Sequence, residues 1–180
     1  LLLATVFQIV PTGAAVGSIN VIAGLSTVWL TASLGGYLRL GRMRFIAALL
    51  VAVDPVLLQY TSRPMTESIC TCLATLWLWK AIRPPLPNVN RPVINGIGTG
   101  AVFGLLVLSR PTFWPIAGLC AAIWLLARRV SDTNLASVRI SDIRRAIGTV
   151  LGTAFGVGPW VIRNWIVFGV PILTTTHGGY

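Results

Sequence analysis

The sequence has few charged residues and very few acids. Only 4 of its 180 residues are Asp or Glu, and charged residues make up 10% of the chain, whereas a soluble domain carries about a quarter. The single histidine, His177, argues against a His-rich metal site or a Ser-His-Asp triad. The three cysteines fall inside apolar runs with no metal-ligand or disulfide spacing, so we expect buried structural thiols: Cys70, Cys72 and Cys120.

Apolar residues are abundant, at 55% of the sequence. A chain of this length has too large a surface-to-volume ratio to hide them all in a water-soluble core, so lipid is the expected solvent. We predict an all-α, polytopic bundle of about six spanning helices, forming a single transmembrane region over 1–180. A short N-terminal juxtamembrane helix is expected over 1–10. The six predicted segments are 14–38, 45–60, 65–82, 93–109, 112–128 and 146–168.

The basic residues alternate between the two sides of this predicted bundle. Eleven of the 14 Lys and Arg residues follow the first, third and fifth segments, and cytoplasmic loops collect such residues. The chain is therefore expected in the plasma (inner) membrane, multi-pass, with its basic loops in the cytoplasm. The net charge of +10 then reflects topology and contact with anionic membrane lipids, and not nucleic acid. The eleven are Arg39, Arg42, Arg44, Lys80, Arg83, Arg91, Arg128, Arg129, Arg139, Arg144 and Arg145.

Glycine recurs at every fourth position in two of the predicted segments. Small residues at this spacing line one face of a helix and let another backbone approach closely. The pattern predicts tight helix packing in the fourth and sixth segments. The two glycine ridges are Gly96, Gly100 and Gly104, and Gly148, Gly152 and Gly156.

The three remaining arginines lie at the opposite, outward ends of the segments, as Arg63, Arg110 and Arg163. Guanidinium groups bind phosphate oxygens in a bidentate way, so three of them at one membrane face suggest an anion site. Glu67 begins the third segment, where a carboxylate is costly unless paired or facing a wet cavity. Simpler roles stay open: an Arg63–Glu67 ion pair, and an Arg110 that extends toward the headgroups.

Asp54 and Pro55 interrupt the apolar run of the second segment. Asp suits the residue that caps a helix N-terminus, and Pro suits the first position inside it. We therefore assign Asp54 to a capping role and not to chemistry.

The order of the outward motifs resembles that of bacterial membrane glycosyltransferases of the GT-C superfamily. The nearest branch contains protein O-mannosyltransferases, of the dolichyl-phosphate-mannose-protein mannosyltransferase type, and the lipid A aminoarabinose transferase. The motifs are P-x-L-L-x-Y-(T/S)-x-R-x-M-T-E over 55–67, L-(S/T)-R-P-T over 108–112, and P-W-x-x-R-N-x-x-x-F-G-x-P-I-x-L-T-T-x-x-G over 159–178. Residues 19–50 resemble the early helix pair of that family with its short basic turn.

The resemblance implies an active site at the extracytoplasmic face and a polyprenyl-phosphate-linked sugar as donor. The family's catalytic acid lies in a first extracytoplasmic loop, which we expect upstream of Leu1. The chain would then be a fragment, inactive alone, that lacks this loop and the C-terminal region, and its catalytic residue is unknown. The resemblance implies substrate binding by Arg63, Glu67, Arg110, Arg163, Asn164 and His177. No cofactor and no metal ligand is evident in the sequence.

The expected activity is transfer of the sugar to a protein, lipid or glycan acceptor. Two other functions fit a multi-pass chain. A transporter or lipid flippase would show inverted repeats and ionisable groups at mid-membrane depth, and we find neither pattern in the sequence. A non-catalytic membrane subunit would use its glycine ridges to bind a partner.

Overall fold

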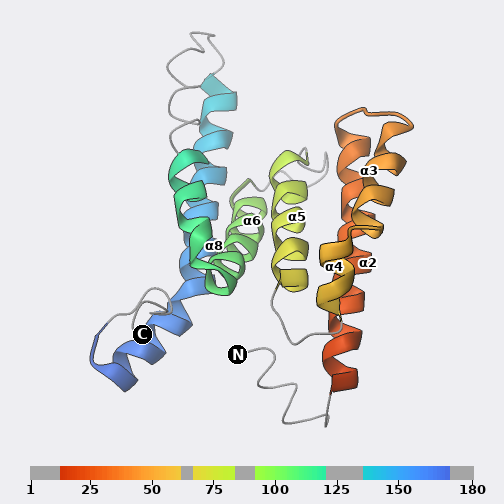
Figure 1. The fold of residues 1–180 in the computed structure, drawn as a ribbon. Coiled ribbons are helices and arrows are strands. Elements are labelled where there is room, and N and C mark those ends of the chain that lie inside the picture. Colours follow the sequence, from red (N-terminus) through yellow and green to blue (C-terminus); the bar gives the residue numbers. More distant parts are fainter. Residues whose placement is uncertain (1–12, 62–66, 84–91, 121–135, 171–180) are drawn as a thin grey trace. The chain divides into compact units, whose positions relative to one another are not determined.

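The computed structural model of the chain describes residues 13–61, 67–83, 92–120 and 136–170, and every regular element in them is helical (Figure 1). The predicted all-α class is therefore confirmed for these residues. Residues 114–120 are also helical. The other elements, in chain order, are α2 (Gly13–Tyr37), α3 (Met43–Ala52), α4 (Pro55–Thr61), α5 (Glu67–Ile82), α6 (Pro92–Ser109), the 3-10 turn η1 (Pro111–Phe113) and α8 (Ala136–Phe168).

Three of the described helices are long and apolar enough to cross a membrane: Gly17–Tyr37, Pro92–Ser109 and Asp142–Phe168. The predicted number of about six is not confirmed. α5 has 16 residues, which rise about 24 Å at 1.5 Å each, less than the ~30 Å of a hydrocarbon core. The predicted juxtamembrane helix over 1–10 and the second half of the segment over 112–128 lie outside the described residues.

The second predicted segment, 45–60, is wrong as a single helix, because the chain breaks between α3 and α4. The break is at Asp54, whose side chain caps α4: Oδ1 accepts a hydrogen bond of 2.9 Å from the amide of Val56. Pro55 follows as the first residue of α4, where its missing amide costs nothing. The capping role predicted for Asp54 is confirmed, and the cap explains why neither half is long enough to span.

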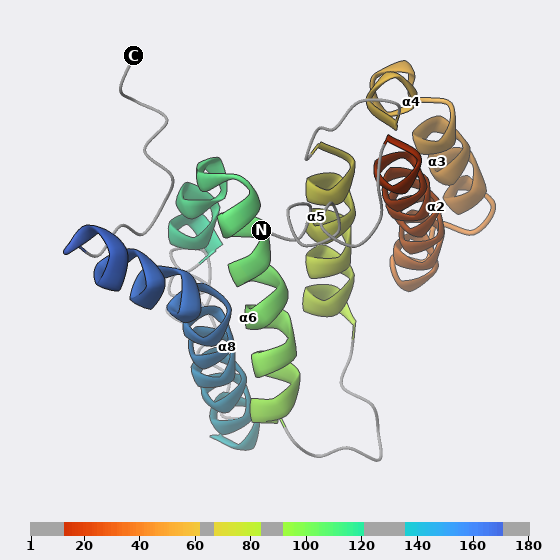
Figure 2. The same ribbon diagram turned by 90° about the horizontal axis from the view of Figure 1, so that it is seen from below.

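α8 begins at Ala136, well before the predicted start at 146, and continues for 33 residues. Arg139, Arg144 and Arg145 therefore lie within its first turns and not in the predicted loop. Polar residues in those turns hid the helix from a prediction based on apolar runs. α8 also bends in its C-terminal part, drawn in blue in Figures 1 and 2. Pro159 lies inside the helix and has no amide to continue the hydrogen-bond ladder, which accounts for the bend.

The chain divides into two compact units, Leu1–Arg83 and Pro84–Tyr180. In unit 1, α2 turns back into α3 through a helix-terminating motif. The amide of Leu40 donates to the carbonyl of Gly35 and that of Arg39 to Gly36, with Arg39 in the left-handed region at φ 56°. α3 packs so closely on the end of α2 that a Cβ on Gly35 would lie 2.6 Å from the Cβ of Arg44.

α2 also packs against α5 in unit 1, and the two helices run parallel. A side-chain hydrogen bond joins Thr27 to Cys72. Further along both helices, the ring of Trp79 lies 6.4 Å from that of Trp29 and 6.3 Å from that of Tyr37. Residues later in α2 contact residues later in α5, so the two helix axes are parallel. Among residues 17–37 of α2, the buried ones are Asn20, Ala23, Thr27, Leu30 and Gly35.

In unit 2, α6 and α8 also run parallel, side by side in both views (Figures 1 and 2). The glycine ridges form the contact, as predicted. A Cβ on Gly104 would lie 3.0 Å from the carbonyl oxygen of Thr153 and 3.2 Å from the Cα of Gly156. At the other end of the contact, a Cβ on Gly148 would lie 3.1 Å from the Cα of Gly96. The two backbones touch directly, which only glycine permits.

Candidate functional site

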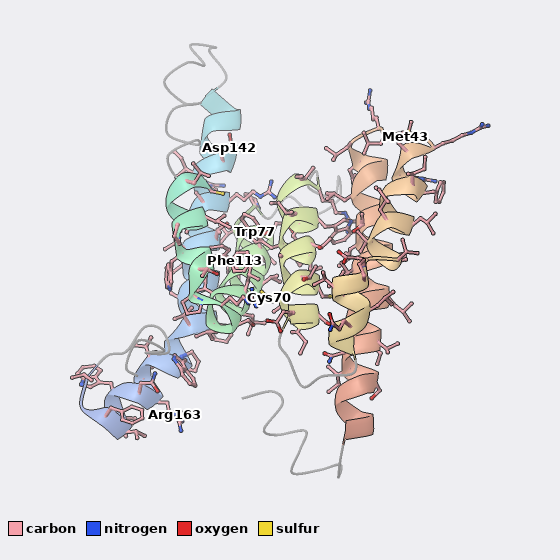
Figure 3. All side chains as sticks on the ribbon, viewed as in Figure 1. Met43, Cys70, Trp77, Phe113, Asp142 and Arg163 are labelled. Atoms are coloured by element: carbon pink, nitrogen blue, oxygen red, sulfur yellow. The ribbon has the colours of Figure 1, made fainter. Side chains whose placement is uncertain are left out.

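The parallel packing in unit 2 places two of the predicted site residues toward the same end of α6 and α8. Arg110 directly follows the last residue of α6, and Arg163 lies in the last turns of α8. Because the two helices run the same way, both arginines belong to the same end of the pair. Arg144 and Arg145 lie at the opposite end, where the carbonyl of Arg145 faces Gly96 near the start of α6. Figure 3 shows Asp142 and Arg163 near opposite ends of α8.

Arg110 lies where α6 ends and the chain turns into η1. Its amide still donates to the carbonyl of Leu106, at 3.0 Å, but its backbone is extended, with φ −145° and ψ 112°. The residue before a proline avoids the helical region, so Pro111 ends α6 at this point. The side chain is exposed at the helix end.

Arg163 belongs to a small cluster beyond the proline bend of α8. Its Nη1 donates to Oδ1 of Asn164 at 3.4 Å, and its Cζ lies 5.7 Å from the centre of the Trp160 ring. Arg163 itself is exposed, whereas Asn164 is only 2% exposed. A buried amide beside an exposed guanidinium limits the positions that the cation can take. The cluster therefore presents a positive charge beside a buried amide at this end of α8.

Glu67 is the first residue of α5 and is half-buried. A carboxylate in the first turn is favoured by the partial positive charge of a helix N-terminus. Its backbone carbonyl accepts a hydrogen bond of 2.9 Å from the hydroxyl of Thr71. The next residue, Ser68, is 2% exposed. Glu67 therefore lies at the start of α5, directly before the first buried residue of that helix.

The structure does not bring all six predicted site residues together. Unit 2 contains Arg110, Arg163 and Asn164, whereas unit 1 contains Glu67. Arg63 and His177 lie outside the described residues, as does the predicted Arg63–Glu67 pair. Within the described ranges, no group of three His, Cys, Asp or Glu side chains could hold a metal ion.

Several buried polar groups, in both units, were missed from the sequence. Asn20 in α2 has no exposed surface, and the indole nitrogen of Trp160 is buried. An aromatic residue near the outer end of a spanning segment is expected in the belt at the membrane interface, and so Trp160 drew no other prediction. Its spacing of three residues from Arg163, one helical turn, was the available signal.

The resemblance to GT-C glycosyltransferases rests on the order and spacing of the outward motifs, of which the L-S-R-P-T and P-W-V-I-R-N segments fall in the described residues. Both segments end at the same end of the parallel pair α6 and α8. Compared with known proteins, the chain matches no family model, no curated sequence and no solved structure.

Proposed function

We propose that the chain forms part of an integral membrane glycosyltransferase that takes a sugar from a polyprenyl-phosphate donor and transfers it to a protein, lipid or glycan at the extracytoplasmic face. The observation that carries the proposal is the common end of α6 and α8, which bears Arg110 and Arg163. Two guanidinium groups at one end of a helix pair can share the negative charge of a phosphate.

A membrane setting is supported by the apolar surface of the spanning helices. Phe155 and Ile166 of α8 are 75% and 80% exposed, and residues of this size are rarely left in water along a whole helix face. In our proposal the bundle lies in the plasma membrane, with Arg144 and Arg145 on the cytoplasmic side and Arg163 outside. This orientation follows the rule that cytoplasmic ends collect basic residues.

In the proposed reaction a carboxylate takes the proton from a hydroxyl of the acceptor. The freed oxygen attacks the anomeric carbon of the donor sugar and forms the new glycosidic bond. The bond from that carbon to the phosphate oxygen breaks, and the configuration inverts. The lipid phosphate leaves with the bonding electrons, and Arg110 and Arg163 stabilise its charge. No residue of this chain is assigned as the base.

The test is sugar transfer by the protein as its gene encodes it, in membranes supplied with a radiolabelled polyprenyl-phosphate sugar. We expect Arg163→Ala and Arg110→Ala each to lower transfer at least tenfold, because each removes a cation that binds the charged leaving phosphate. The control is Arg144→Ala, which removes an exposed cation from the other end of α8. Wild-type transfer by both site variants would refute the site. Movement of the labelled lipid across the bilayer without transfer would indicate a transporter.

A further inference from the structure

The last turns of α8 carry a buried face that continues past the proline bend. Val157 is 5% exposed and Asn164, two turns later, is 2% exposed. Residues seven apart lie on the same side of a helix, and a residue three after the first and four before the second lies between them. That residue is Trp160, which is half-buried. Its ring therefore belongs to the buried face of α8 and not to the surface in contact with lipid.

The indole N–H of Trp160 is buried, yet no acceptor for it lies among the residues that the structure describes. A buried Trp usually finds a hydrogen-bond partner for this group, and leaving a buried donor unpaired costs about 1–3 kcal/mol. A buried donor of this kind marks a place for an acceptor other than the residues that the structure describes.

Positive charge lies next to this donor. The guanidinium of Arg163 is 5.7 Å from the centre of the Trp160 ring, within the range of a cation–π contact. The guanidinium also donates to Oδ1 of Asn164 at 3.4 Å. An acceptor that reached the indole N–H would therefore meet a cation held one helical turn away, so a negatively charged acceptor is favoured over a neutral one.

We propose that Trp160 and Arg163 together bind one phosphate group: the indole N–H donates a hydrogen bond to one oxygen, and the guanidinium binds the others. The phosphate is that of the polyprenyl donor, and this identity rests on the proposed function. Trp160 is thus a further substrate-binding residue. Asn164 is a positioning residue, which holds the guanidinium of Arg163.

Unit 1 contains a related pair that serves as a control. The Cζ of Arg83 lies 4.7 Å from the ring centre of Trp79, whose indole nitrogen is also buried with no acceptor in the described ranges. Trp79, however, packs against two aromatic rings, those of Trp29 and Tyr37. Trp160 has a buried amide, Asn164, as its neighbour on the same face. Replacing Trp79 tests whether any buried indole N–H would give the same effect.

The experiment measures binding of a radiolabelled polyprenyl monophosphate to the purified protein, as its gene encodes it, in nanodiscs. Trp160→Phe keeps an aromatic ring and removes the donor, and Arg163→Ala removes the charge. The controls are Trp79→Phe and Trp165→Phe, the latter at a residue of α8 that is 62% exposed. Separate samples replace the label with uncharged polyprenol or with phosphatidylglycerol. Helix content and thermal unfolding are measured for every variant.

We expect Trp160→Phe to weaken binding of the monophosphate about tenfold, as for loss of one hydrogen bond to a charged group. Arg163→Ala should weaken it at least as much, and neither control should change it. Binding of uncharged polyprenol should not differ among the variants. Equal weakening for phosphatidylglycerol would show that the site takes membrane phosphodiesters instead, and would overturn the identity of the ligand.

The outcomes separate this inference from the proposed function. If Trp160→Phe binds like Trp165→Phe while the wild-type protein transfers sugar, the inference is wrong and the function stands. If Trp160→Phe weakens phosphate binding but the wild-type protein transfers no sugar, the phosphate site stands and the function is wrong. A Trp160→Phe protein with altered helix content is replaced by Trp160→Tyr, whose hydroxyl is set differently on the ring and should not restore binding; full binding by that variant overturns the inference.

Discussion

The two units solve the same packing problem in different ways. Each holds two parallel helices, α2 with α5 in unit 1 and α6 with α8 in unit 2. In unit 2 the glycines bring the backbones into contact, and the hydroxyl of Thr153 donates across to the carbonyl of Gly100 at 3.2 Å. In unit 1 side chains fill the contact: a Thr–Cys hydrogen bond and three aromatic rings.

This difference has consequences for how each pair responds to change. A contact between backbones has no side chain that can move aside, so any added atom must separate the helices. A contact made by side chains can repack, and its loss is partial. Unit 2 should therefore be the more sensitive to substitution. The glycine contact is also the one that directs the ends bearing Arg110 and Arg163 the same way.

The largest effect is expected from Gly100→Leu. A Cβ at this position would lie 2.7 Å from the carbonyl carbon of Thr149 and 2.8 Å from the amide nitrogen of Thr153. The helices must separate, and we expect a loss of about 3 kcal/mol or more in the free energy of unfolding, above the usual cost of overpacking. The measurement is hydrogen–deuterium exchange of peptides in detergent, together with unfolding in SDS.

The matched control is Gly158→Ala, in α8 itself, because nothing lies within 4 Å of a Cβ at that residue. It should leave stability within about 1 kcal/mol of the wild type. Exchange in Gly100→Leu should rise over 92–109 and 145–157 and stay unchanged in α2. A rise of equal size in both units would contradict their division.

The second largest effect is expected from Trp79→Ala in unit 1. Trp79 touches Trp29 and Tyr37 and stacks with Arg83. Removing a partly buried tryptophan should cost about 2–3 kcal/mol, less than in a tight core because neighbouring rings can move into the space. Trp79→Phe keeps the ring contacts and should cost under about 1 kcal/mol. If Trp79→Ala cost more than Gly100→Leu, the order of sensitivity given to the two units would be reversed.

The sequence predicted the contact of unit 2 better than that of unit 1, for a physical reason. Glycine every fourth residue has few uses other than close approach, so the spacing of Gly96 and Gly148 from their neighbouring glycines was enough to identify both helices as packing elements. Thr27 and Cys72 belong to no comparable repeat, and threonine and cysteine are common in helices whether or not they form a helix contact. The parallel pairing of α2 with α5 could not be predicted from either residue.

The number of spans was predicted less well, because apolar runs do not show where a helix stops. The segment over 45–60 is apolar almost throughout, yet a single cap at Asp54 divides it. The start of α8 was hidden in the opposite way, by polar residues such as Asp142 that are helical. For the candidate site, the sequence predicted that Arg110 and Arg163 lie at helix ends. The buried donor of Trp160 was not, because burial depends on what packs against the ring.

A smaller effect of opposite sign is expected at the turn from α2 to α3, which ties unit 1 together. Arg39 has φ 56°, a conformation that costs an ordinary residue about 1 kcal/mol relative to glycine. Arg39→Gly should therefore raise the free energy of unfolding by about that amount. The control is Arg42→Gly, which removes the same charge at a residue with φ −72°. A gain in Arg42→Gly as large as in Arg39→Gly would trace the effect to charge.

The smallest effect is expected from Thr27→Val, which removes the hydrogen bond between α2 and α5 while keeping the shape of the side chain. Hydrogen bonds between membrane helices contribute about 0.6 kcal/mol on average. The hydroxyl of Thr27 donates its proton to the carbonyl of Ala23 at 2.8 Å, so its oxygen is the acceptor toward Cys72. We expect a loss of ~0.6 kcal/mol in SDS unfolding. Thr27→Ser retains the hydroxyl and should keep the hydrogen bond. If Thr27→Val cost several times this value, the polar contact and not the aromatic cluster would hold α2 against α5, and unit 1 would depend on a single point much as unit 2 depends on its glycines.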